Sequence, residues 1–435
     1  MYHFIGIKGA GMSSLATIMK KLNYEVQGSD VEKHFFTEEE LIKNNISIFP
    51  YDEKNINENL TIIKGLSITE DNPELKKARE LNLKIINYNE MVGILTKKFK
   101  TICISGCHGK TTTTAMTSHV LNQIKGINYL IGDGTGYANI KNEYFALESC
   151  EYKRHFLSYI PYYSVILNID LDHVDYFKDL NDVIDAYTEF ANSTTKMIIA
   201  NGDDSNVRKM QVNKNIIYFG LNDNNDIKAT NIEYTNEGIK FDVLVNNQHY
   251  GHFALPIYGQ HQLIDALAVI SICYYENIDA NEVAKCFQTF HGAKRRFSET
   301  FVGNNIIIDD YAHHPNEIKS TINAIKQKYP DKKIVSIFQP HTFTRTKEFA
   351  RDIAEELSKT DVSYVMDIHP AREKQEDYKD ITKDIIINKI KNGYPLTIND
   401  VEILNKHKNA VFIFMSPNDI SKLEKDLINL KEFEK

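Results

Sequence analysis

A strand-like apolar run that leads straight into a turn of glycines and lysine constrains this chain more than any other feature. Residues 102–114 read ICISGCHGKTTTT, so the run is followed by the spacing Gly106-x-x-Gly109-Lys110. Glycines let backbone N–H groups approach phosphate oxygens, and the start of the following helix attracts anions. Strand, turn and helix in this order predict a phosphate-binding loop in an α/β domain. The strict pattern has a glycine where Ile104 stands, which makes this a variant loop.

The loop and the strands beside it supply a candidate catalytic set. Lys110 is placed to reach the β- and γ-phosphates of a nucleotide, and the Thr111 hydroxyl is placed to bind Mg²⁺. The ends of two neighbouring predicted strands add Glu148 and His173, with Glu151 three residues after the first of these. Carboxyl ends of parallel strands meet at one edge of a sheet, so the acid and the imidazole can hold Mg²⁺ between phosphate and acceptor.

A second glycine turn lies at the start of the chain. Gly6-x-x-Gly9-x-Gly11 follows a predicted strand and opens a helix, and Asp30 follows the second strand as a candidate ribose acceptor. This arrangement is similar to a dinucleotide fingerprint, although Ser14 replaces its third glycine. The turn therefore predicts a diphosphate site and leaves NAD, FAD and a UDP-sugar open as its ligand.

The last third of the chain carries three polar clusters. Each contains acids, imidazoles or arginines, and two of them directly follow predicted strands. Such a set is typical of a substrate and phosphate edge, because arginine donates two parallel hydrogen bonds to a carboxylate or phosphoryl group. The adjacent pair His313-His314 does not by itself indicate a zinc site. The clusters are Lys294-Arg295-Arg296, Asp309-Asp310-Tyr311-Ala312-His313-His314-Pro315 and Gln339-Pro340-His341-Thr342-Phe343-Thr344-Arg345.

Short apolar runs alternate with helical patterns along most of the chain, which indicates parallel strands joined by crossover helices. Residues 226–256 differ, because alternating residues broken by Asn-containing turns after Thr235 and Val245 predict antiparallel hairpins. A helix is predicted at residues 260–275, and the charged tail after Leu423 is predicted to be a solvated helix face. Three α/β units in series result. The predicted strands are 2–7, 25–28, 60–64, 84–87, 100–106, 144–148, 163–169, 196–200, 305–309, 333–338, 363–367 and 410–415.

Composition narrows the functional classes. The formal net charge of −8 argues against a general nucleic-acid binder, which needs clustered positive charge. No apolar run approaches the roughly 18 residues of a membrane-spanning helix, and the first residues lack the basic and then apolar pattern of a secretory signal. The five cysteines form no CxxC pair, which favours reduced and mostly buried thiols. We therefore expect a cytoplasmic protein without membrane insertion.

Taken together and in this order, the motifs resemble those of the Mur ligase family. The resemblance runs through nearly the whole chain and implies an α/β fold of three domains. It implies a Rossmann-like UDP-sugar domain at residues 1–98, a P-loop ATPase domain with a mixed sheet and a β-hairpin region at 99–293, and a Rossmann-like amino-acid domain at 294–435. The motifs are Gly6–Ser13, Gly106–Thr112, Asn168–His173, Lys294–Phe297, Asp309–Pro315 and Gln339–Thr346.

The resemblance implies an ATP-dependent ligase of peptidoglycan precursor synthesis. ATP would phosphorylate the carboxylate of UDP-N-acetylmuramate to an acyl phosphate, and the amine of L-alanine would then displace phosphate to form an amide. The implied cofactor is Mg²⁺, with Mn²⁺ as a substitute, and the implied partners are ATP, the sugar nucleotide and the amino acid. No nucleic-acid partner is expected, and the protein is expected to be a monomer or a homodimer. A recycling ligase that attaches a whole murein tripeptide to the same sugar nucleotide remains open.

Two hypotheses from other functional classes also remain. A NAD-type oxidoreductase would use the first glycine turn but would leave Gly109-Lys110-Thr111 unexplained. A non-catalytic sugar-nucleotide-binding or regulatory protein would keep the phosphate loop for ligand sensing.

The resemblance also implies roles for individual side chains. The catalytic set is Lys110, Glu148 and His173, and the metal ligands are Thr111, Glu148 and His173. ATP binding is implied for Gly106, His108, Gly109, Lys110, Thr111, Thr112, His261, Asp265 and Arg296. UDP-sugar binding is implied for Gly9, Gly11, Met12, Ser13 and Asp30, and contact with the amino acid or another substrate for Glu151, Arg295, Tyr311, His313 and Arg345.

Three positions depart from the family pattern. The family usually has asparagine where Asp265 stands and often a basic residue where Thr342 stands. The segment Met415–Asp419 replaces a commoner glycine-rich turn. Arg372 and Glu373 belong to a further loop that resembles the family, and both are expected substrate contacts.

Overall fold

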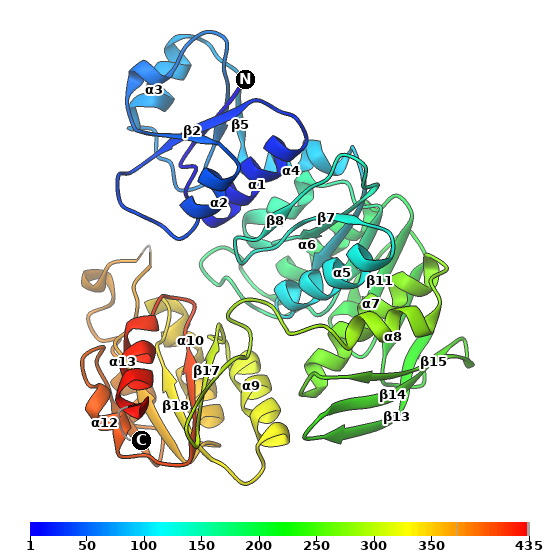
Figure 1. The fold of residues 1–435 in the computed structure, drawn as a ribbon, viewed down its shortest axis with the longest axis vertical. Helices are drawn as coiled ribbons and strands as arrows, with labels where there is room; N and C mark the ends of the chain where they lie inside the picture. The colour runs from blue at the N-terminus through cyan, green and yellow to red at the C-terminus, as the bar shows by residue number, and fades with distance from the viewer. Residues whose placement is uncertain (372, 433–435) are drawn as a thin grey trace.

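The computed structural model describes residues 1–371 and 373–432, and these form three α/β units, each built on its own sheet. Figure 1 shows the N-terminal unit at the top, the central unit at the right and the C-terminal unit at the lower left. Each sheet is made from one continuous stretch of chain. The expected α/β architecture with three units in series is confirmed. Arg372, an expected substrate contact, lies outside the described residues.

The N-terminal sheet has five parallel strands in the order β3-β2-β1-β4-β5, which is a doubly wound, Rossmann-like arrangement. Apolar side chains of the α1 helix pack on this sheet, with Leu15, Ile18 and Met19 fully buried. The elements are β1 (Tyr2–Ile5), α1 (Ala10–Lys21), β2 (Val26–Asp30), α2 (Glu38–Lys43), β3 (Ser47–Pro50), η1 (Glu53–Asn55), β4 (Thr61–Lys64), α3 (Pro73–Glu80), β5 (Ile85–Asn87) and α4 (Tyr88–Thr96).

The central sheet has ten strands in the order β15-β14-β13-β12-β11-β10-β6-β9-β7-β8. Strands β13 to β15 pair antiparallel, as the hairpin prediction for residues 226–256 expected, and most of the others pair parallel. The elements are β6 (Lys100–Ser105), α5 (Lys110–Ile124), β7 (Ile127–Leu130), β8 (Gly136–Tyr137), β9 (Tyr144–Glu148), η2 (Tyr152–Ser158), β10 (Tyr163–Ile166), α6 (Leu180–Asn192), β11 (Met197–Asn201), η3 (Val207–Lys209), β12 (Ile216–Gly220), β13 (Ile227–Thr235), β14 (Gly238–Val245), β15 (Gln248–Leu255), α7 (Gln260–Tyr275) and α8 (Ala280–Phe287).

The C-terminal sheet has six strands in the order β16-β17-β21-β18-β19-β20, and only the edge strand β16 runs antiparallel to its neighbour. The elements are β16 (Ser298–Val302), β17 (Asn305–Asp310), α9 (Pro315–Lys328), β18 (Lys333–Phe338), α10 (Phe343–Leu357), β19 (Val362–Val365), η4 (Gln375–Tyr378), α11 (Asp384–Ile387), β20 (Gly393–Pro395), α12 (Val401–Asn405), β21 (Ala410–Met415) and α13 (Ser421–Glu432).

Two sequence-based predictions need revision. The tail after Leu423 is not simply solvated, because Leu423 and Leu427 on α13 are fully buried in the core of the C-terminal unit. The short strands β3, β7, β8, β12, β16 and β20 were not predicted. None of the helices in the described residues is long and apolar enough to cross a bilayer. All five cysteines are free, and four of them are buried.

Candidate active site

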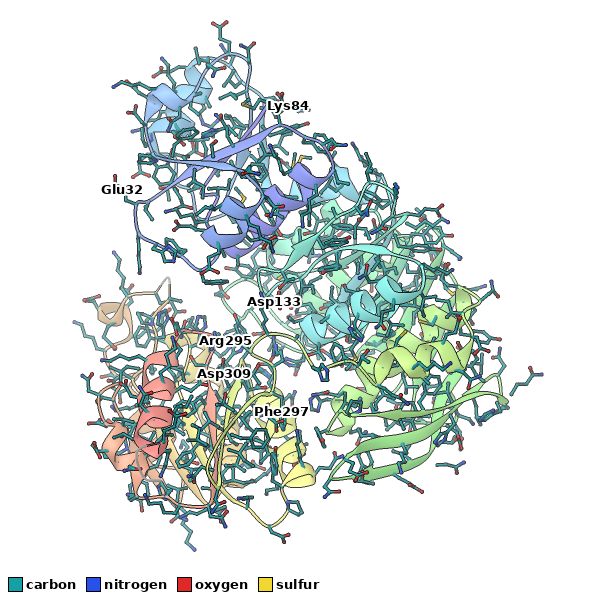
Figure 2. All side chains as sticks on the ribbon, in the orientation of Figure 1. Glu32, Lys84, Asp133, Arg295, Phe297 and Asp309 are labelled. Carbon is teal, nitrogen blue, oxygen red and sulfur yellow. The ribbon has the colours of Figure 1, made fainter. Side chains whose placement is uncertain are left out.

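The carboxyl ends of the central strands β6, β9 and β10 face the C-terminal unit across a cavity of about 300 Å³, the catalytic cavity. The central unit contributes the phosphate loop and the strand-end acids, and the C-terminal unit contributes the polar clusters after β17 and β18. Figure 2 places Asp133, which lines this cavity, and Arg295 where the two units meet. The sheet edges therefore bring together side chains that are more than 200 residues apart in the sequence, such as Lys110 and Arg345.

The phosphate loop has the backbone that its glycines predict. Gly106 and Gly109 have φ values of +147° and +84°, which residues with a Cβ rarely adopt. Lys110 folds back over the loop, with its Nζ atom 2.5 Å from the Gly106 carbonyl and 3.0 Å from a Glu151 carboxylate oxygen. Burial alone would lower the pKa of Lys110, but the Glu151 carboxylate together with Cys150, Cys107 and Glu148 outweighs this effect, and the pKa lies above its ordinary value. The loop thus holds a largely buried, charged ammonium group beside an acid.

The predicted metal ligands line the same cavity. The Thr111 hydroxyl donates to Glu148 at 3.0 Å, and the other Glu148 oxygen accepts from the Gly132 backbone at 2.7 Å. Burial lowers the pKa of His173, which leaves its imidazole neutral and able to coordinate a cation. A hydroxyl, a carboxylate and a neutral imidazole fit a divalent cation, since Mg²⁺ is usually held by few protein groups together with phosphates.

A second cavity of about 460 Å³, the nucleotide cavity, also borders Gly109. Thr112, His261 and Asp265 line it, together with polar groups that follow β10 and β11. Burial lowers the pKa of His261 to about 4, so this imidazole is uncharged at neutral pH. Gly109 and Arg296 border both cavities, which joins the two spaces at the phosphate loop.

Arg345 reaches across the catalytic cavity to the central unit. Its guanidinium donates to Asp172 at 2.5 Å, and both side chains are less than a tenth exposed. Burial would raise the pKa of Asp172, but the charge of Arg345, together with His173 and His313, holds it well below its usual value. Tyr311 and His313 lie in the same cavity, and the Arg296 guanidinium stacks over the Tyr311 ring at 4.8 Å from its centre. The C-terminal unit therefore presents cationic and hydrogen-bonding groups to the phosphate loop.

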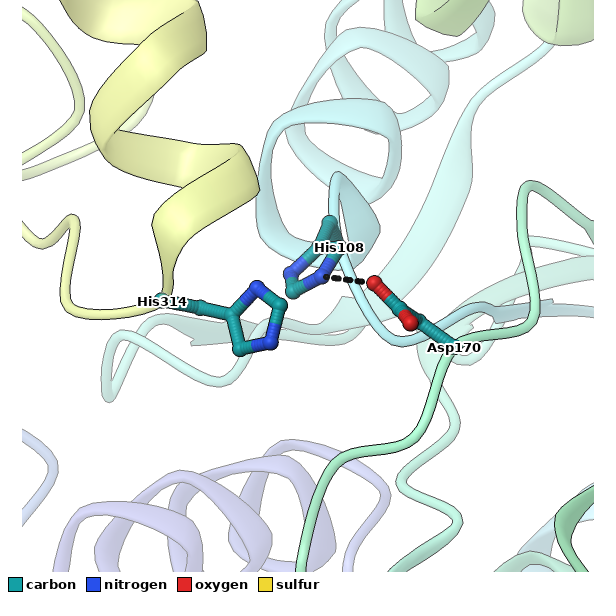
Figure 3. A group of neighbouring side chains, drawn as sticks. All are labelled: His108, Asp170 and His314. Carbon is teal, nitrogen blue, oxygen red and sulfur yellow. Dashed lines mark ion pairs between the residues drawn. The ribbon is translucent and has the colours of Figure 1, made fainter. Parts of the chain in front are cut away.

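A second link between the units runs through His108, in the phosphate loop. Figure 3 shows His108 between Asp170 and His314, and the two imidazole rings have centres 4.6 Å apart and planes 34° from parallel. Burial alone would lower the pKa of His108, but Asp170 and Glu317, each 3.5 Å away, raise it to about 9. Imidazoles bind a metal ion in the plane of the ring, and here the two rings are packed face over face. This arrangement suits a protonated His108 held between the Asp170 and Glu317 carboxylates better than a metal ion bound by both histidines.

Arg295 is placed differently from the other predicted substrate contacts. Its guanidinium pairs with Asp309 at 3.0 Å and donates to the Ser416 and Asn418 carbonyls at 2.8 and 3.0 Å. The segment Met415–Asp419, which departs from the family pattern, thus supplies the carbonyls that hold this arginine. A direct contact of Arg295 with substrate stays a prediction.

Hydrogen bonds within the N-terminal unit stabilise the first glycine turn. Asp30 accepts from the Lys8 backbone at 2.7 Å and from the Val31 backbone at 2.8 Å, so the predicted ribose acceptor already has two backbone donors. The Ser13 hydroxyl donates to the Ala10 carbonyl at 3.0 Å. Met12 is buried in the core of the N-terminal unit. Gly9 and Gly11 stand at the start of α1, where backbone N–H groups are available to an anion.

Sequence reasoning missed Glu317, which contacts His108, His313 and Arg296 at 3.5, 3.1 and 3.7 Å. Its side chain also accepts from the His314 backbone in a capping box at the start of α9. The spacing of His314 and Glu317 around Pro315 is a recognisable helix start, so the acid could have been placed next to the histidines.

The loop that was expected to contact substrate through Glu373 is also fixed by a helix start. One Glu373 oxygen accepts from the Phe343 backbone at 2.5 Å, and the other accepts from the Thr344 hydroxyl at 2.5 Å. Thr342, which stands where the family often has a basic residue, caps the same helix, α10. Because Glu373 and Thr344 both line the catalytic cavity, this cap sets one of its walls.

Comparisons with known proteins agree with this geometry. Three family models match the chain: the Mur ligase family catalytic domain at residues 1–100, the Mur ligase middle domain at 104–273, and the Mur ligase glutamate ligase domain at 295–416. The chain is 26% identical to UDP-N-acetylmuramate–alanine ligase from Thermotoga maritima, with a TM-score of 0.82 over 100% of this chain and 99% of that chain.

Two further solved structures share the fold at lower identity. A murein peptide ligase from Psychrobacter arcticus is 20% identical, with a TM-score of 0.74 over 99% of this chain and 98% of that chain. A pseudomurein peptide ligase type C from Methanothermus fervidus is 18% identical, with a TM-score of 0.67 over 99% of each chain.

Proposed function

The chain belongs to the Mur ligase family, and from this premise we propose that it is an ATP-dependent ligase that joins the carboxylate of UDP-N-acetylmuramate to the amine of L-alanine. The observation that carries the proposal is the catalytic cavity, where Lys110 and Thr111 of the phosphate loop face Arg345 and His313 of the C-terminal unit. ATP would enter from the second cavity, and the amino acid would bind on the side of Arg345. The limits proposed for the three domains stay at residues 98/99 and 293/294.

The proposed reaction needs an activated carboxylate, because a free carboxylate is a poor electrophile. Transfer of the γ-phosphoryl group from ATP gives an acyl phosphate and ADP. The amine then attacks the acyl carbon, and the tetrahedral intermediate collapses to an amide and inorganic phosphate. Lys110 would leave Glu151 and neutralise charge on the transferring group, which is catalysis by positioning and electrostatics.

Thr111, Glu148 and His173 would hold Mg²⁺, or Mn²⁺ in its place, and the ion would supply positive charge next to the phosphates. On the side of the amino acid, Arg345 would receive the carboxylate. His313 has its Nδ1 atom 3.0 Å from the Tyr311 carbonyl and 3.1 Å from Glu317, so Nδ1 carries the proton. Its Nε2 atom is then the one able to take a proton from the attacking amine.

The N-terminal turn would bind the diphosphate of the sugar nucleotide through the backbone N–H groups at the start of α1. Docking of the C-terminal unit, through Arg345 and Asp172, would exclude water from the acyl phosphate.

The test is phosphate release from ATP and Mg²⁺ with UDP-N-acetylmuramate, adding L-alanine, glycine, L-serine or the murein tripeptide singly. We expect kcat/KM for L-alanine to exceed the others at least about tenfold, which is roughly 1.4 kcal/mol. Turnover with the tripeptide alone would assign the protein to peptide recycling. Binding of nucleotide without turnover on any of the four would leave a sugar-nucleotide-binding protein.

A further inference from the structure

Asp265 is buried at an unusual place for a carboxyl group. It lies on α7, is 4% exposed and lines the nucleotide cavity. One oxygen, Oδ1, is 2.6 Å from the position that a Cβ atom on Gly109 would take, so the carboxyl group lies against the phosphate loop. The other oxygen, Oδ2, is buried and has no hydrogen-bond partner among the described residues. The carboxyl group therefore lies in the wall of the space into which the nucleotide would come, with one buried oxygen that the described residues leave unpaired.

An ionised carboxylate at this position would be unfavourable for two reasons. Burial removes it from water, and its negative charge would oppose the phosphates that the adjacent loop is built to bind. The charged and titratable groups that face Asp265 offset this poorly. Arg296, from the segment before β16, pairs instead with Glu317 at 3.7 Å, and His261 on the same helix has its pKa lowered to about 4 by burial. The Thr113 hydroxyl of α5 also lies beside Asp265.

A protonated carboxyl group has one donor and one acceptor, which is the hydrogen-bonding character of a side-chain amide. We propose that Asp265 serves the nucleotide site in its protonated, uncharged form, as a group that can both donate and accept a hydrogen bond. The inference rests on the proposed nucleotide binding and adds a condition to it: nucleotide binds well only while Asp265 keeps its proton. The direction of its pKa, raised by burial to about 8, agrees with this condition.

The test is the dissociation constant of Mg·ADP from the full chain, measured by calorimetry at pH 7, 8 and 9 in the wild type and in Asp265→Asn. His108, with a pKa of about 9, also titrates over this range. Because it is present in both proteins, the ratio of the two dissociation constants isolates the effect of Asp265. We expect the wild-type constant to equal that of the variant at pH 7 and to exceed it about tenfold at pH 9. Asp185→Asn, on the exposed face of α6, is the matched control and should follow the wild type.

Calorimetry in buffers of different ionisation enthalpy gives a second readout that a purely structural role would not move. At pH 8 the wild type should take up about half a proton when it binds ADP, of which His108 accounts for at most about a tenth of a proton. Asp265→Asn should take up only that smaller amount. If the variant does not fold, wild-type uptake decides alone.

The two levels of the proposal fail in different ways. Wild-type protein that binds no ADP at pH 7 would refute the proposed function. Protein that binds ADP with a constant ratio over the pH range, or without proton uptake at pH 8, would refute the role of Asp265 and leave the ligase proposal in place.

Discussion

The two glycine turns of this chain have the same local design and different uses. Gly6-Ile7-Lys8-Gly9 and Gly106-Cys107-His108-Gly109 each join the first strand of a sheet to a helix, and both begin with a glycine at positive φ. After the turn, the first has Ala10 where the second has Lys110. In the first turn Lys8 binds the Val31 carbonyl at 2.7 Å and Glu38 at 3.1 Å, all within one unit.

At the second turn one cation contacts another unit and the other lies in the catalytic cavity. His108 contacts Glu317 of the C-terminal unit, and Lys110 lies in the catalytic cavity beside Glu151. The turn itself provides only an anion site made of backbone N–H groups. The side chains around it decide whether that site only binds a phosphate or also stabilises the charge of a phosphoryl group in transfer.

Exchanging the residue after the turn should give the largest effect. Lys110→Ala gives the second turn the residue of the first, and we expect kcat for phosphate release to fall about 10²- to 10³-fold because transition-state charge loses its partner. Lys8→Ala should leave kcat within about threefold, since Lys8 only holds its own turn. Lys110→Arg, which keeps the charge, should retain more activity than Lys110→Ala. Similar losses of kcat in Lys8→Ala and Lys110→Ala would remove the distinction between the turns.

Replacing the last glycine of each turn should give the second-largest difference between the two turns. Gly109 has φ +84° and an added Cβ would meet Asp265 at 2.6 Å, whereas Gly9 has φ −58° and its nearest neighbour would be 3.5 Å away. We expect Gly109→Ala to weaken ADP binding about tenfold to hundredfold, since strain of this kind costs roughly 1–3 kcal/mol. Gly9→Ala should fold as well as the wild type and weaken only the sugar nucleotide. Calorimetric titration of both ligands against both variants measures this, and normal ADP binding by Gly109→Ala would contradict it.

The cation at the third position of the turn gives a pH-dependent effect. The pKa of His108, about 9, lies above the ordinary value near 6.5, so its stabilisation is complete below pH 6.5 and is lost as pH rises through 9. We expect His108→Asn to be less stable than the wild type at pH 6.5, by up to about 3 kcal/mol. The gap should close near pH 10, as followed by urea denaturation. A gap that is independent of pH would mean that the ring packing on His314, and not the charge, is what counts.

The acid at the end of the second strand, Asp30, should give the smallest effect. Asp30→Ala leaves the backbone N–H groups of Lys8 and Val31 without their acceptor, and we expect a loss of about 1–2 kcal/mol in the stability of the N-terminal unit. Phosphate release at saturating sugar nucleotide should be unchanged. Asp30→Asn, which keeps one acceptor oxygen, should lose less stability, and a fall in kcat without a fall in stability would show that Asp30 acts on the reaction.

Much of the fold could be predicted from local patterns. The helix at residues 260–275 and the strands at 144–148, 333–338 and 410–415 have the predicted bounds, because each is a sharply limited apolar run. The missed strands lie mostly at sheet edges. Ser47–Pro50 and Ser298–Val302 are largely exposed and lack an apolar signal, so only pairing with a neighbour makes them strands.

The candidate site was predictable where it depends on one segment and not where it depends on two. The glycines and Lys110 follow from the spacing of the loop. The pairing of Arg345 with Asp172 joins residues from two units, and the position of Arg295 depends on carbonyls more than 120 residues away, so neither follows from a local pattern.

Each of the three sheets is formed by strands from one continuous stretch of chain, and this has a consequence for synthesis. A chain emerging from the ribosome can complete the N-terminal sheet and then the central sheet without waiting for later strands. The phosphate loop therefore exists before Tyr311, His313 and Arg345 have been made. Under the proposed function, a nascent chain at that stage has the phosphate loop but lacks Asn316 and Glu317, which line the nucleotide cavity, and has no receptor for the amine. Productive turnover therefore begins only when the last sheet has folded and docked.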